Sequence, residues 1–454
     1  MNSDQTRPRA QKLSTILFAG AILPACGFFG WFSFSVLLQK SISFSRGDLV
    51  VCGLANLLLL VPVLLRAKHS FVARLALIQW SLLFVFVPAE LLLRLAFRQP
   101  PTPWDPNTVR EITLSVPFEG VAAKGTFSTN ELGLRGRSLP LAQLESVDLP
   151  ILCVGGSTTE CFYNSDENAW PAVLERSIAK RTGGRVFVGN AGRGGHIARH
   201  HAWQLKHYRF APRFRIVVVL CGWNDLSAAL FHDPAAAPRD IAGESLTRGL
   251  NFTASAEPHT PFYRNLAIGK LFQEVVFSRS WNPVANAGWR AVIQDPYGEW
   301  VAERRKIRQK CIESGALTTP PAQLEEALNQ FSADLEAIHA AISQEQMLIF
   351  ITQPTLCRAA LTEEQAARLW SCDGKRAWTA AATAAMLTQF NDVTRRYCRE
   401  HNLTCVDAEV AMSGDPALFY DDCHFSDAGC SALADLVANR VIAVSDPKAI
   451  VGRD

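Results

Sequence analysis

From residue 150 onward, short apolar runs alternate with longer segments of helical periodicity, and this alternation constrains the fold more than any other feature. A run of about five apolar residues suits a β-strand, whereas apolar residues recurring every three or four positions suit an amphipathic helix. Strands that alternate with helices pair in parallel through right-handed crossovers. The pattern therefore predicts an α/β fold, namely a three-layer, doubly wound parallel sheet.

The expected strands are 151–154, 185–188, 214–220, 347–352 and 404–407. The expected helices are 170–181, 196–208, 324–344, 377–401 and 426–442. The run 214–220 is almost unbroken in apolar residues, which is typical of a central strand buried on both faces. The stretch 226–323 is too long for a simple loop. We interpret it as an insertion with helices near 266–277 and 301–314, forming either a cap over a site or a peripheral decoration.

Long apolar runs also occupy the first hundred residues, at 13–38, 49–65 and about 75–97. A transmembrane helix needs about 20 apolar residues, so residues 1–98 are predicted to be a membrane region with about three transmembrane helices. Basic residues are denser before the first run and between the second and third, and such flanks stay cytoplasmic. The remaining chain is therefore expected on the periplasmic side of the inner membrane, as a linker with short strands at 99–149 and a main domain at 150–445.

The net charge and the absence of two motifs limit the partners and cofactors that are expected. The formal net charge is +3, which gives no electrostatic case for a nucleic-acid partner. The chain has no His-Glu-x-x-His sequence and no Walker loop, so neither a metal nor a nucleotide cofactor is expected.

Six of the 12 cysteines lie between residues 357 and 430. In an oxidising compartment Cys357 could pair with Cys372 and Cys398 with Cys405, and the alternative is that several remain free.

Polar residues follow three of the expected strands, where open parallel sheets form their sites. The first strand runs into Gly155-Gly-Ser157, a turn that can expose a serine hydroxyl and its backbone N–H, although such a turn can also cradle a phosphate. The second ends in Asn190-Ala-Gly-Arg-Gly-Gly195, whose glycines let backbone N–H groups approach an anion. The third ends in Gly-Trp-Asn224, whose side-chain amide can donate to an oxyanion.

A fourth group of polar residues precedes the last expected helix. Asp421 and His424 are three positions apart, so the carboxylate can orient the imidazole that takes a proton from a serine. Asp422 is a second candidate for the same role, because spacing alone allows either. Near the third strand, Asp225 is expected to brace the loop that holds Asn224. Arg193 and His196 are expected at the surface, with substrate contact as the alternative.

Taken in order, Gly-Gly-Ser157, Asn-x-Gly-x-x-Gly195, Gly-x-Asn224 and Asp421-x-x-His424 resemble the SGNH, or GDSL-type, hydrolase superfamily over residues 150–445. Gly-Gly-Ser replaces the commoner Gly-Asp-Ser, and Thr159 removes the Gly-x-Ser-x-Gly elbow of the α/β-hydrolases. The resemblance is to a membrane-anchored bacterial member with a flavodoxin-like sheet. It implies a nucleophile at Ser157, a base at His424, an orienting acid at Asp421, and an oxyanion hole formed by Ser157, Gly195 and Asn224.

Three functions are compatible with these residues. The leading hypothesis is a serine esterase that removes acyl groups, with acetyl expected, from a cell-envelope glycan or lipid-linked sugar. The second is an O-acyltransferase that uses the same residues within envelope polysaccharide machinery and places the acyl group on a sugar hydroxyl. The third is a non-catalytic, membrane-anchored glycan-binding protein. The sequence leaves the substrate, and the choice between hydrolysis and transfer, undecided.

Overall fold

The computed structural model describes residues 102–104, 106–231 and 290–445, all within one of the two compact units into which the chain divides. The apolar runs predicted to cross a membrane, and the expected helix at 266–277, lie outside the described residues. Among the residues that the structure describes, no helix is both long and apolar enough to cross a bilayer.

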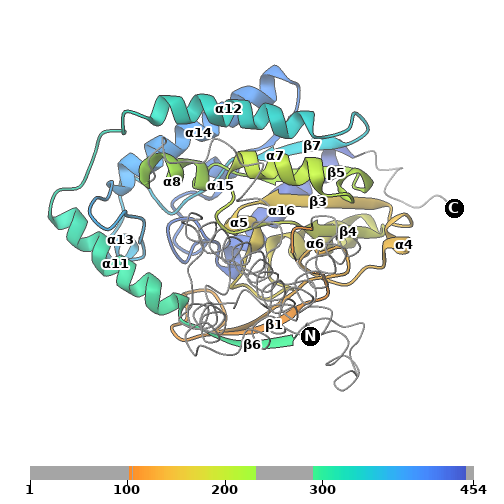
Figure 1. Ribbon diagram of the computed structural model, residues 1–454, viewed down its shortest axis with the longest axis horizontal. Helices are drawn as coiled ribbons and strands as arrows, with labels where there is room; N and C mark the ends of the chain where they lie inside the picture. The colour runs from red at the N-terminus through yellow and green to blue at the C-terminus, as the bar shows by residue number, and fades with distance from the viewer. Residues whose placement is uncertain (1–101, 105, 232–289, 446–454) are drawn as a thin grey trace, which may run out of the picture. The chain divides into compact units, whose positions relative to one another are not determined.

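A five-stranded parallel sheet forms the centre of the described unit (Figure 1). Its strands are β3 (Leu149–Gly155), β4 (Val186–Asn190), β5 (Ile216–Leu220), β7 (Met347–Ile351) and β8 (Thr404–Val406). They lie in the order β4-β3-β5-β7-β8, and every neighbouring pair is parallel. The predicted α/β fold with a parallel sheet is therefore confirmed. The strand order reverses at β3, because the chain goes outward to β4 and returns past β3 to β5, and ligands bind at such switch points.

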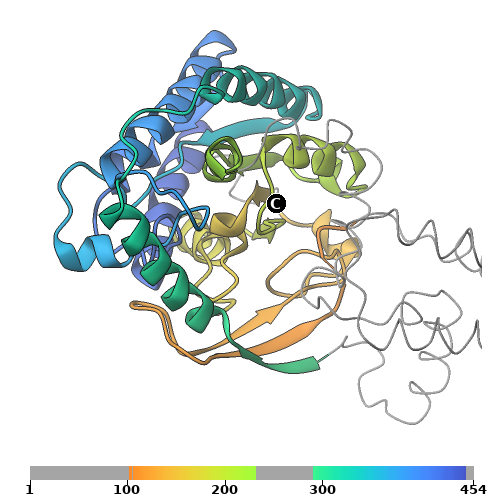
Figure 2. The same cartoon turned by 60° about the vertical axis from the view of Figure 1, so that its left-hand side comes forward.

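Helices cover both faces of this sheet (Figures 1 and 2). One face carries α6 (Trp170–Thr182) and α16 (Asp427–Val444), which pack against each other. The other carries α7 (Ala198–His207), α8 (Trp223–Phe231), α12 (Leu324–Ala340) and α14 (Ala380–Glu400). Caps set the ends of several helices. Gly183, for example, closes α6 in the left-handed conformation at φ 73°, which glycine adopts without strain.

A second, smaller sheet consists of β2 (Lys124–Ser128), β1 (Val109–Leu114) and β6 (Arg290–Asp295), in that order. β1 pairs antiparallel with β2 and parallel with β6. The predicted insertion thus returns to pair with the segment before the main sheet, which the sequence did not indicate. The helix expected at 301–314 is α11 (Tyr297–Glu313). The shorter helices are α4 (Leu141–Leu144), α5 (Ser157–Glu160), η1 (Ala211–Arg213), α13 (Glu363–Ala367) and α15 (Ala408–Met412).

The cysteine pairings considered from sequence do not occur as disulfides. All ten described cysteines are free thiols, including Cys357 and Cys372. The thiols of Cys398 and Cys405 lie near each other and interact electrostatically. A further close pair lies between the end of α5 and α16, since Cys161 Sγ lies 3.9 Å from Cys430 Sγ.

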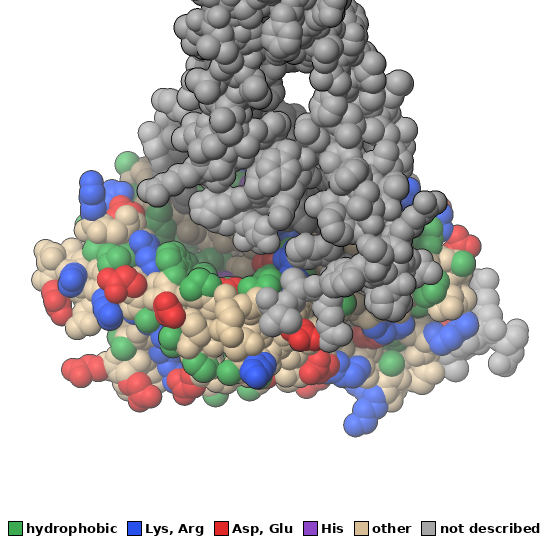
Figure 3. All heavy atoms as spheres, turned by 60° about the horizontal axis from the view of Figure 1, so that its bottom comes forward, with side chains coloured by type: hydrophobic (Ala, Val, Ile, Leu, Met, Phe, Trp, Pro, Cys, Tyr) green, Lys and Arg blue, Asp and Glu red, His purple; other side chains and the backbone are tan. Residues whose placement is uncertain are grey.

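The described surface carries charges of both signs. Figure 3 shows lysine and arginine side chains beside aspartate and glutamate on the part of this face that is in view. This mixture agrees with the nearly balanced charge of the whole chain.

Candidate active site

Ser157 begins a four-residue helix, α5, directly after the central strand β3. Two glycines precede it because other backbone and side-chain groups approach this turn closely. A Cβ on Gly155 would lie 2.6 Å from the carbonyl oxygen of Leu220 on β5, and a Cβ on Gly156 would lie 2.5 Å from Nδ2 of Asn224. The sequence therefore places Ser157 at the carboxyl end of β3, at the switch point of the sheet.

A continuous chain of hydrogen bonds joins the predicted serine, histidine and aspartate. His424 Nε2 lies 2.8 Å from Ser157 Oγ, and His424 Nδ1 lies 2.8 Å from Asp421 Oδ2. Asp421 Oδ1 also accepts the backbone N–H groups of Cys423 (3.0 Å) and His424 (2.9 Å). These local bonds form the turn before α16 and hold the imidazole toward the serine.

Burial and charge act in opposite directions on this pair. The Asp421 carboxylate is fully buried, and burial raises its pKa. The His424 charge and the N–H donors lower this pKa by more than burial raises it, so the pKa of Asp421 is lowered overall. Burial likewise lowers the pKa of His424, and the Asp421 carboxylate more than offsets this, so the pKa of His424 is raised. The site thus stabilises the imidazolium that forms when His424 takes a proton.

The structure distinguishes between the two neighbouring aspartates. The Asp422 carboxylate accepts the backbone N–H groups of Trp370 (2.8 Å) and Ser371 (3.3 Å). Burial raises the pKa of Asp422, and the Arg308 charge opposes this. Asp421 alone faces the imidazole, and the indole Nε1 of Trp370 donates to its Oδ2 at 3.0 Å. No sequence motif indicated Trp370, which lies in an irregular stretch after α13.

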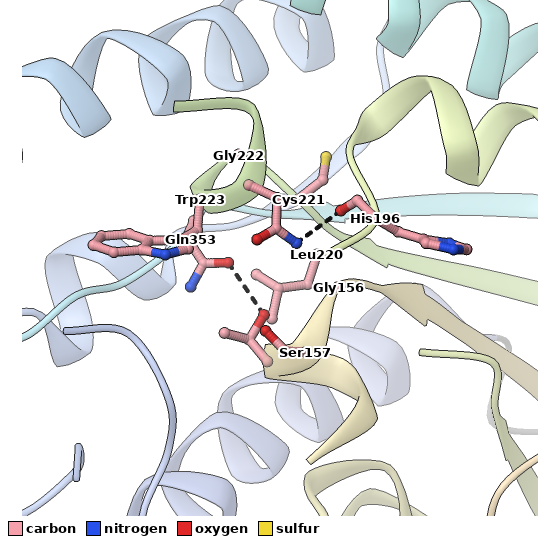
Figure 4. Close-up of a pocket in the computed structure, with 10 residues that line it drawn as sticks. Gly156, Ser157, His196, Leu220, Cys221, Gly222, Trp223 and Gln353 are labelled. Atoms are coloured by element: carbon pink, nitrogen blue, oxygen red, sulfur yellow. Dashed lines mark hydrogen bonds between the residues drawn. The ribbon is translucent and has the colours of Figure 1, made fainter. Parts of the chain in front are cut away.

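An open hollow of about 210 Å³ lies beside the serine (Figure 4). Its lining includes Ser157, Asn224, Trp223 and Gln353, together with the backbone at the end of β5. Asn224 Nδ2 donates to the carbonyl oxygen of His196 at 2.9 Å, which fixes the orientation of the amide. Both the serine and the amide therefore border one small space that can receive a carbonyl group.

Asp225 braces this region, as the sequence suggested. Its carboxylate accepts the N–H groups of Ala198 (3.0 Å) and Gly222 (3.2 Å), and so connects the start of α7 with the loop before Asn224. Burial raises the pKa of Asp225 to about 7. The loop after β4 lies alongside, and Gly195 in it has a φ of 76°.

The expectation that Arg193 and His196 lie at the surface is wrong. Their exposed fractions are only 4% and 9%. The Arg193 guanidinium lies 3.5 Å from the ring centre of Trp104, a residue from the segment before the main sheet. Sequence periodicity could not reveal this contact, because the two residues belong to distant parts of the chain.

One trio in the described part of the chain offers metal-ligand atoms within 4.8 Å of one another, namely Asp421, Cys423 and His424. The Nδ1 atom of His424 is already engaged with Asp421. Burial raises the pKa of Cys423 well above its usual value, so its thiol stays protonated. This donor set suits the serine–histidine–aspartate arrangement better than a metal ion.

Residues 153–432 match the GDSL-like lipase/acylhydrolase family. The chain belongs to this family. It is accordingly a hydrolase that acts on ester bonds, and the match covers the serine, the glycine-rich loop, Asn224 and the Asp421–His424 pair. A comparison with curated proteins found no match for this GDSL-family chain.

Solved structures similar to this GDSL-family chain include three bacterial proteins. The lipase/acylhydrolase from Enterococcus faecalis is 17% identical, with a TM-score of 0.33, over 66% of this chain and 98% of that one. A putative lipolytic protein of the G-D-S-L family from Desulfitobacterium hafniense is 12% identical, with a TM-score of 0.30, over 64% and 97%. The acetylxylan esterase Axe2 from Geobacillus stearothermophilus is 13% identical, with a TM-score of 0.33, over 65% and 94%.

Proposed function

We propose that this acylhydrolase removes acetyl groups from a cell-envelope glycan or lipid-linked sugar by means of Ser157, His424 and Asp421. The observation that carries the proposal is the hydrogen-bond chain from Ser157 Oγ through His424 to Asp421 Oδ2, with 2.8 Å at each step. Such a chain lets the imidazole accept the serine proton while the carboxylate stabilises the resulting charge.

The reaction proceeds in two steps. Ser157 Oγ attacks the ester carbonyl and passes its proton to His424 Nε2, and the tetrahedral oxyanion is held by the N–H groups of Ser157 and Gly195 and by Nδ2 of Asn224. Collapse of this intermediate expels the sugar oxygen, which takes the proton from His424 and becomes a hydroxyl, and leaves acetyl on Ser157. Water then gives a proton to His424, attacks the acetyl carbonyl and releases acetate, and the proton returns to Ser157.

The side chains beside the nucleophile support a short acyl group. Trp223 and Gln353 border the hollow next to Ser157, and Thr158 Oγ1 donates to Gln353 Oε1 at 3.3 Å. Figure 4 shows Trp223 and Gln353 on the side of the hollow opposite His196. The choice of an envelope glycan rests on the predicted membrane region and on the periplasmic placement that we propose for the main domain.

Hydrolysis of p-nitrophenyl esters and labelling with a fluorophosphonate test the proposal. We expect acetate to be cleaved faster than butyrate or octanoate, and Ser157→Ala to abolish both cleavage and labelling. The matched control is Ser177→Ala, which removes another helical serine hydroxyl that donates to Asp435 (3.0 Å) away from the site. A folded wild type that neither cleaves acetate nor reacts with the probe would instead support a glycan-binding protein.

Two further measurements separate the remaining alternatives. The full chain is incubated with an acetyl ester, with and without an oligosaccharide acceptor. Acetylated sugar that forms faster than free acetate would establish acyl transfer rather than hydrolysis. A reporter fused to the C-terminus and active only in the cytoplasm would contradict the periplasmic placement.

A further inference from the structure

The glycine-rich loop after β4 packs directly on the short helix that begins with the nucleophile. A Cβ on Gly192 would lie 2.2 Å from the backbone nitrogen of Glu160, and a Cβ on Gly194 would lie 2.7 Å from Oε2 of Glu160. These glycines were expected to let backbone N–H groups approach an anion. In this structure Gly194 approaches the carboxyl group of Glu160, and Gly192 approaches the backbone of the same residue.

Glu160 is buried, with an exposed fraction of 7%, and its carboxylate lies directly against the backbone of Gly194. Burial raises the pKa of Glu160, while the charges of Arg193 and Arg135 and the Gly194 N–H oppose that increase. Arg135 also donates to the backbone carbonyl of Glu160 at 2.6 Å. Both the side chain and the backbone of Glu160 are therefore held.

The same loop is also fixed on its outer side. The indole Nε1 of Trp104 donates to the carbonyl oxygen of Gly192 at 3.0 Å, and the guanidinium of Arg193 lies over the Trp104 ring at 3.5 Å. The backbone N–H of Arg193 donates to the carbonyl oxygen of Gly155 at 2.9 Å. The loop is thus tied to the turn that carries Ser157.

Gly195 lies between two anchored residues. On one side Gly194 lies against the Glu160 carboxylate, and on the other the His196 carbonyl oxygen accepts Nδ2 of Asn224 at 2.9 Å. Gly195 itself has a φ of 76°, a conformation in which only glycine is unstrained. Once its two neighbours are fixed, the direction of the Gly195 N–H is fixed as well.

We propose that Glu160 is a positioning residue of the oxyanion hole, whose carboxylate holds Gly194 and thereby directs the Gly195 N–H at the oxyanion. The inference rests on the proposed function, because that function assigns Gly195 its role as a donor. The oxyanion exists in the tetrahedral intermediate and the transition states around it but not in the bound substrate, so a loosened Gly195 lowers kcat and leaves KM almost unchanged.

Three substitutions at Glu160 separate its hydrogen bond from its charge. Glu160→Gln keeps an acceptor oxygen of similar reach and removes the charge. Glu160→Asp keeps the charge and withdraws the acceptor from Gly194. Glu160→Ala removes both. Kinetics with p-nitrophenyl acetate, fluorophosphonate labelling rates and melting temperatures are measured for each full-length variant.

We expect Glu160→Ala to lower kcat by about 10²–10³-fold, as the loss of one oxyanion donor does, with KM changed little. Glu160→Asp should lose more kcat than Glu160→Gln, because the acceptor position matters more than the charge. The labelling rate should fall in the same order, since the phosphonyl oxygen needs the same donors. If Glu160→Ala does not fold, the comparison of Glu160→Gln with Glu160→Asp decides alone.

The matched control is Glu175→Gln. Glu175 is another carboxylate that accepts a backbone N–H, that of Val188 at 2.7 Å, and it pairs with Arg137 away from the site. This variant should lower the melting temperature without lowering kcat. An active wild type combined with unchanged kcat in the Glu160 variants, or with Glu160→Asp more active than Glu160→Gln, would overturn this inference alone. A wild type without activity or labelling would overturn the proposed function itself.

Discussion

Replacing Asp421 with asparagine should stop the reaction with little loss of structure, and the contacts of the carboxylate explain why. Asp421 Oδ1 accepts the backbone N–H groups of Cys423 and His424 and lies 3.0 Å from His424 Nδ1, whereas Oδ2 lies closer to His424 Nδ1, at 2.8 Å, and accepts Trp370 Nε1. Asparagine has only one acceptor oxygen. If the NH₂ group of the asparagine occupied the Oδ1 position, it would face two backbone N–H donors. If it occupied the Oδ2 position, it would face only the N–H donor of Trp370.

The second orientation is therefore favoured, and it removes the base. The amide NH₂ then donates to Nδ1 of His424, which keeps the imidazole proton on Nε2. Since Nε2 faces Ser157 Oγ at 2.8 Å, it can no longer accept the serine proton. A wrong tautomer of this kind costs about 10⁴-fold in kcat, or about 5.5 kcal/mol.

The assay is p-nitrophenyl acetate hydrolysis by wild type, Asp421→Asn and the control Asp422→Asn, with a thermal melt of each. Asp422 binds the backbone N–H groups of Trp370 and Ser371, so its replacement should lower the melting temperature and leave kcat nearly unchanged. The reasoning would be refuted if folded Asp421→Asn kept most of its activity, or if both variants lost kcat equally.

Three further outcomes follow from the same geometry. The pKa of His424 is raised above its ordinary 6.5, and only the neutral imidazole accepts a proton, so kcat/KM should fall as pH drops through this raised pKa; a pH–rate profile with an acid limb below 6.5 would contradict this. Asn224→Ala should lower kcat by about 10²–10³-fold in steady-state kinetics, and unchanged kcat would remove the amide from the oxyanion hole. Trp370→Phe removes one donor to the Asp421 carboxylate, a bond worth about 1.5–3 kcal/mol, and should lower kcat about tenfold or more, whereas a lower melting temperature alone would indicate a structural role.

The main sheet was predictable because its signals are local. The run 214–220 contains β5 (Ile216–Leu220), and the run 347–352 contains β7 (Met347–Ile351), since buried parallel strands need continuous apolar residues. The candidate site could also be predicted from the sequence, because polar residues that follow the strands meet at one edge of a parallel sheet. The four sequence blocks thus come together around Ser157 although they are far apart in the chain.

Contacts between distant segments were not predictable. β6 pairs with β1 although most of the domain's sequence separates the two strands. No periodic pattern in either strand indicates its partner. Arg193 and Glu160 are charged residues whose types favour the surface. Their burial depends on Trp104 and Arg135, which precede the main sheet in the chain. A single sequence carries no signal for such pairings.

Arg135 also determines how much of the chain forms a transferable catalytic unit. Its fully buried guanidinium donates to the carbonyl oxygens of Glu160 (2.6 Å), Cys161 (2.5 Å) and Asn164 (2.6 Å). These carbonyls follow the nucleophile, and buried carbonyls without partners are costly. The family match begins only at residue 153, after Arg135 and Trp104. A chimaera that borrowed residues 150–445 alone would therefore carry the reacting side chains without the scaffold that orients them, and one that began before Trp104 would carry both.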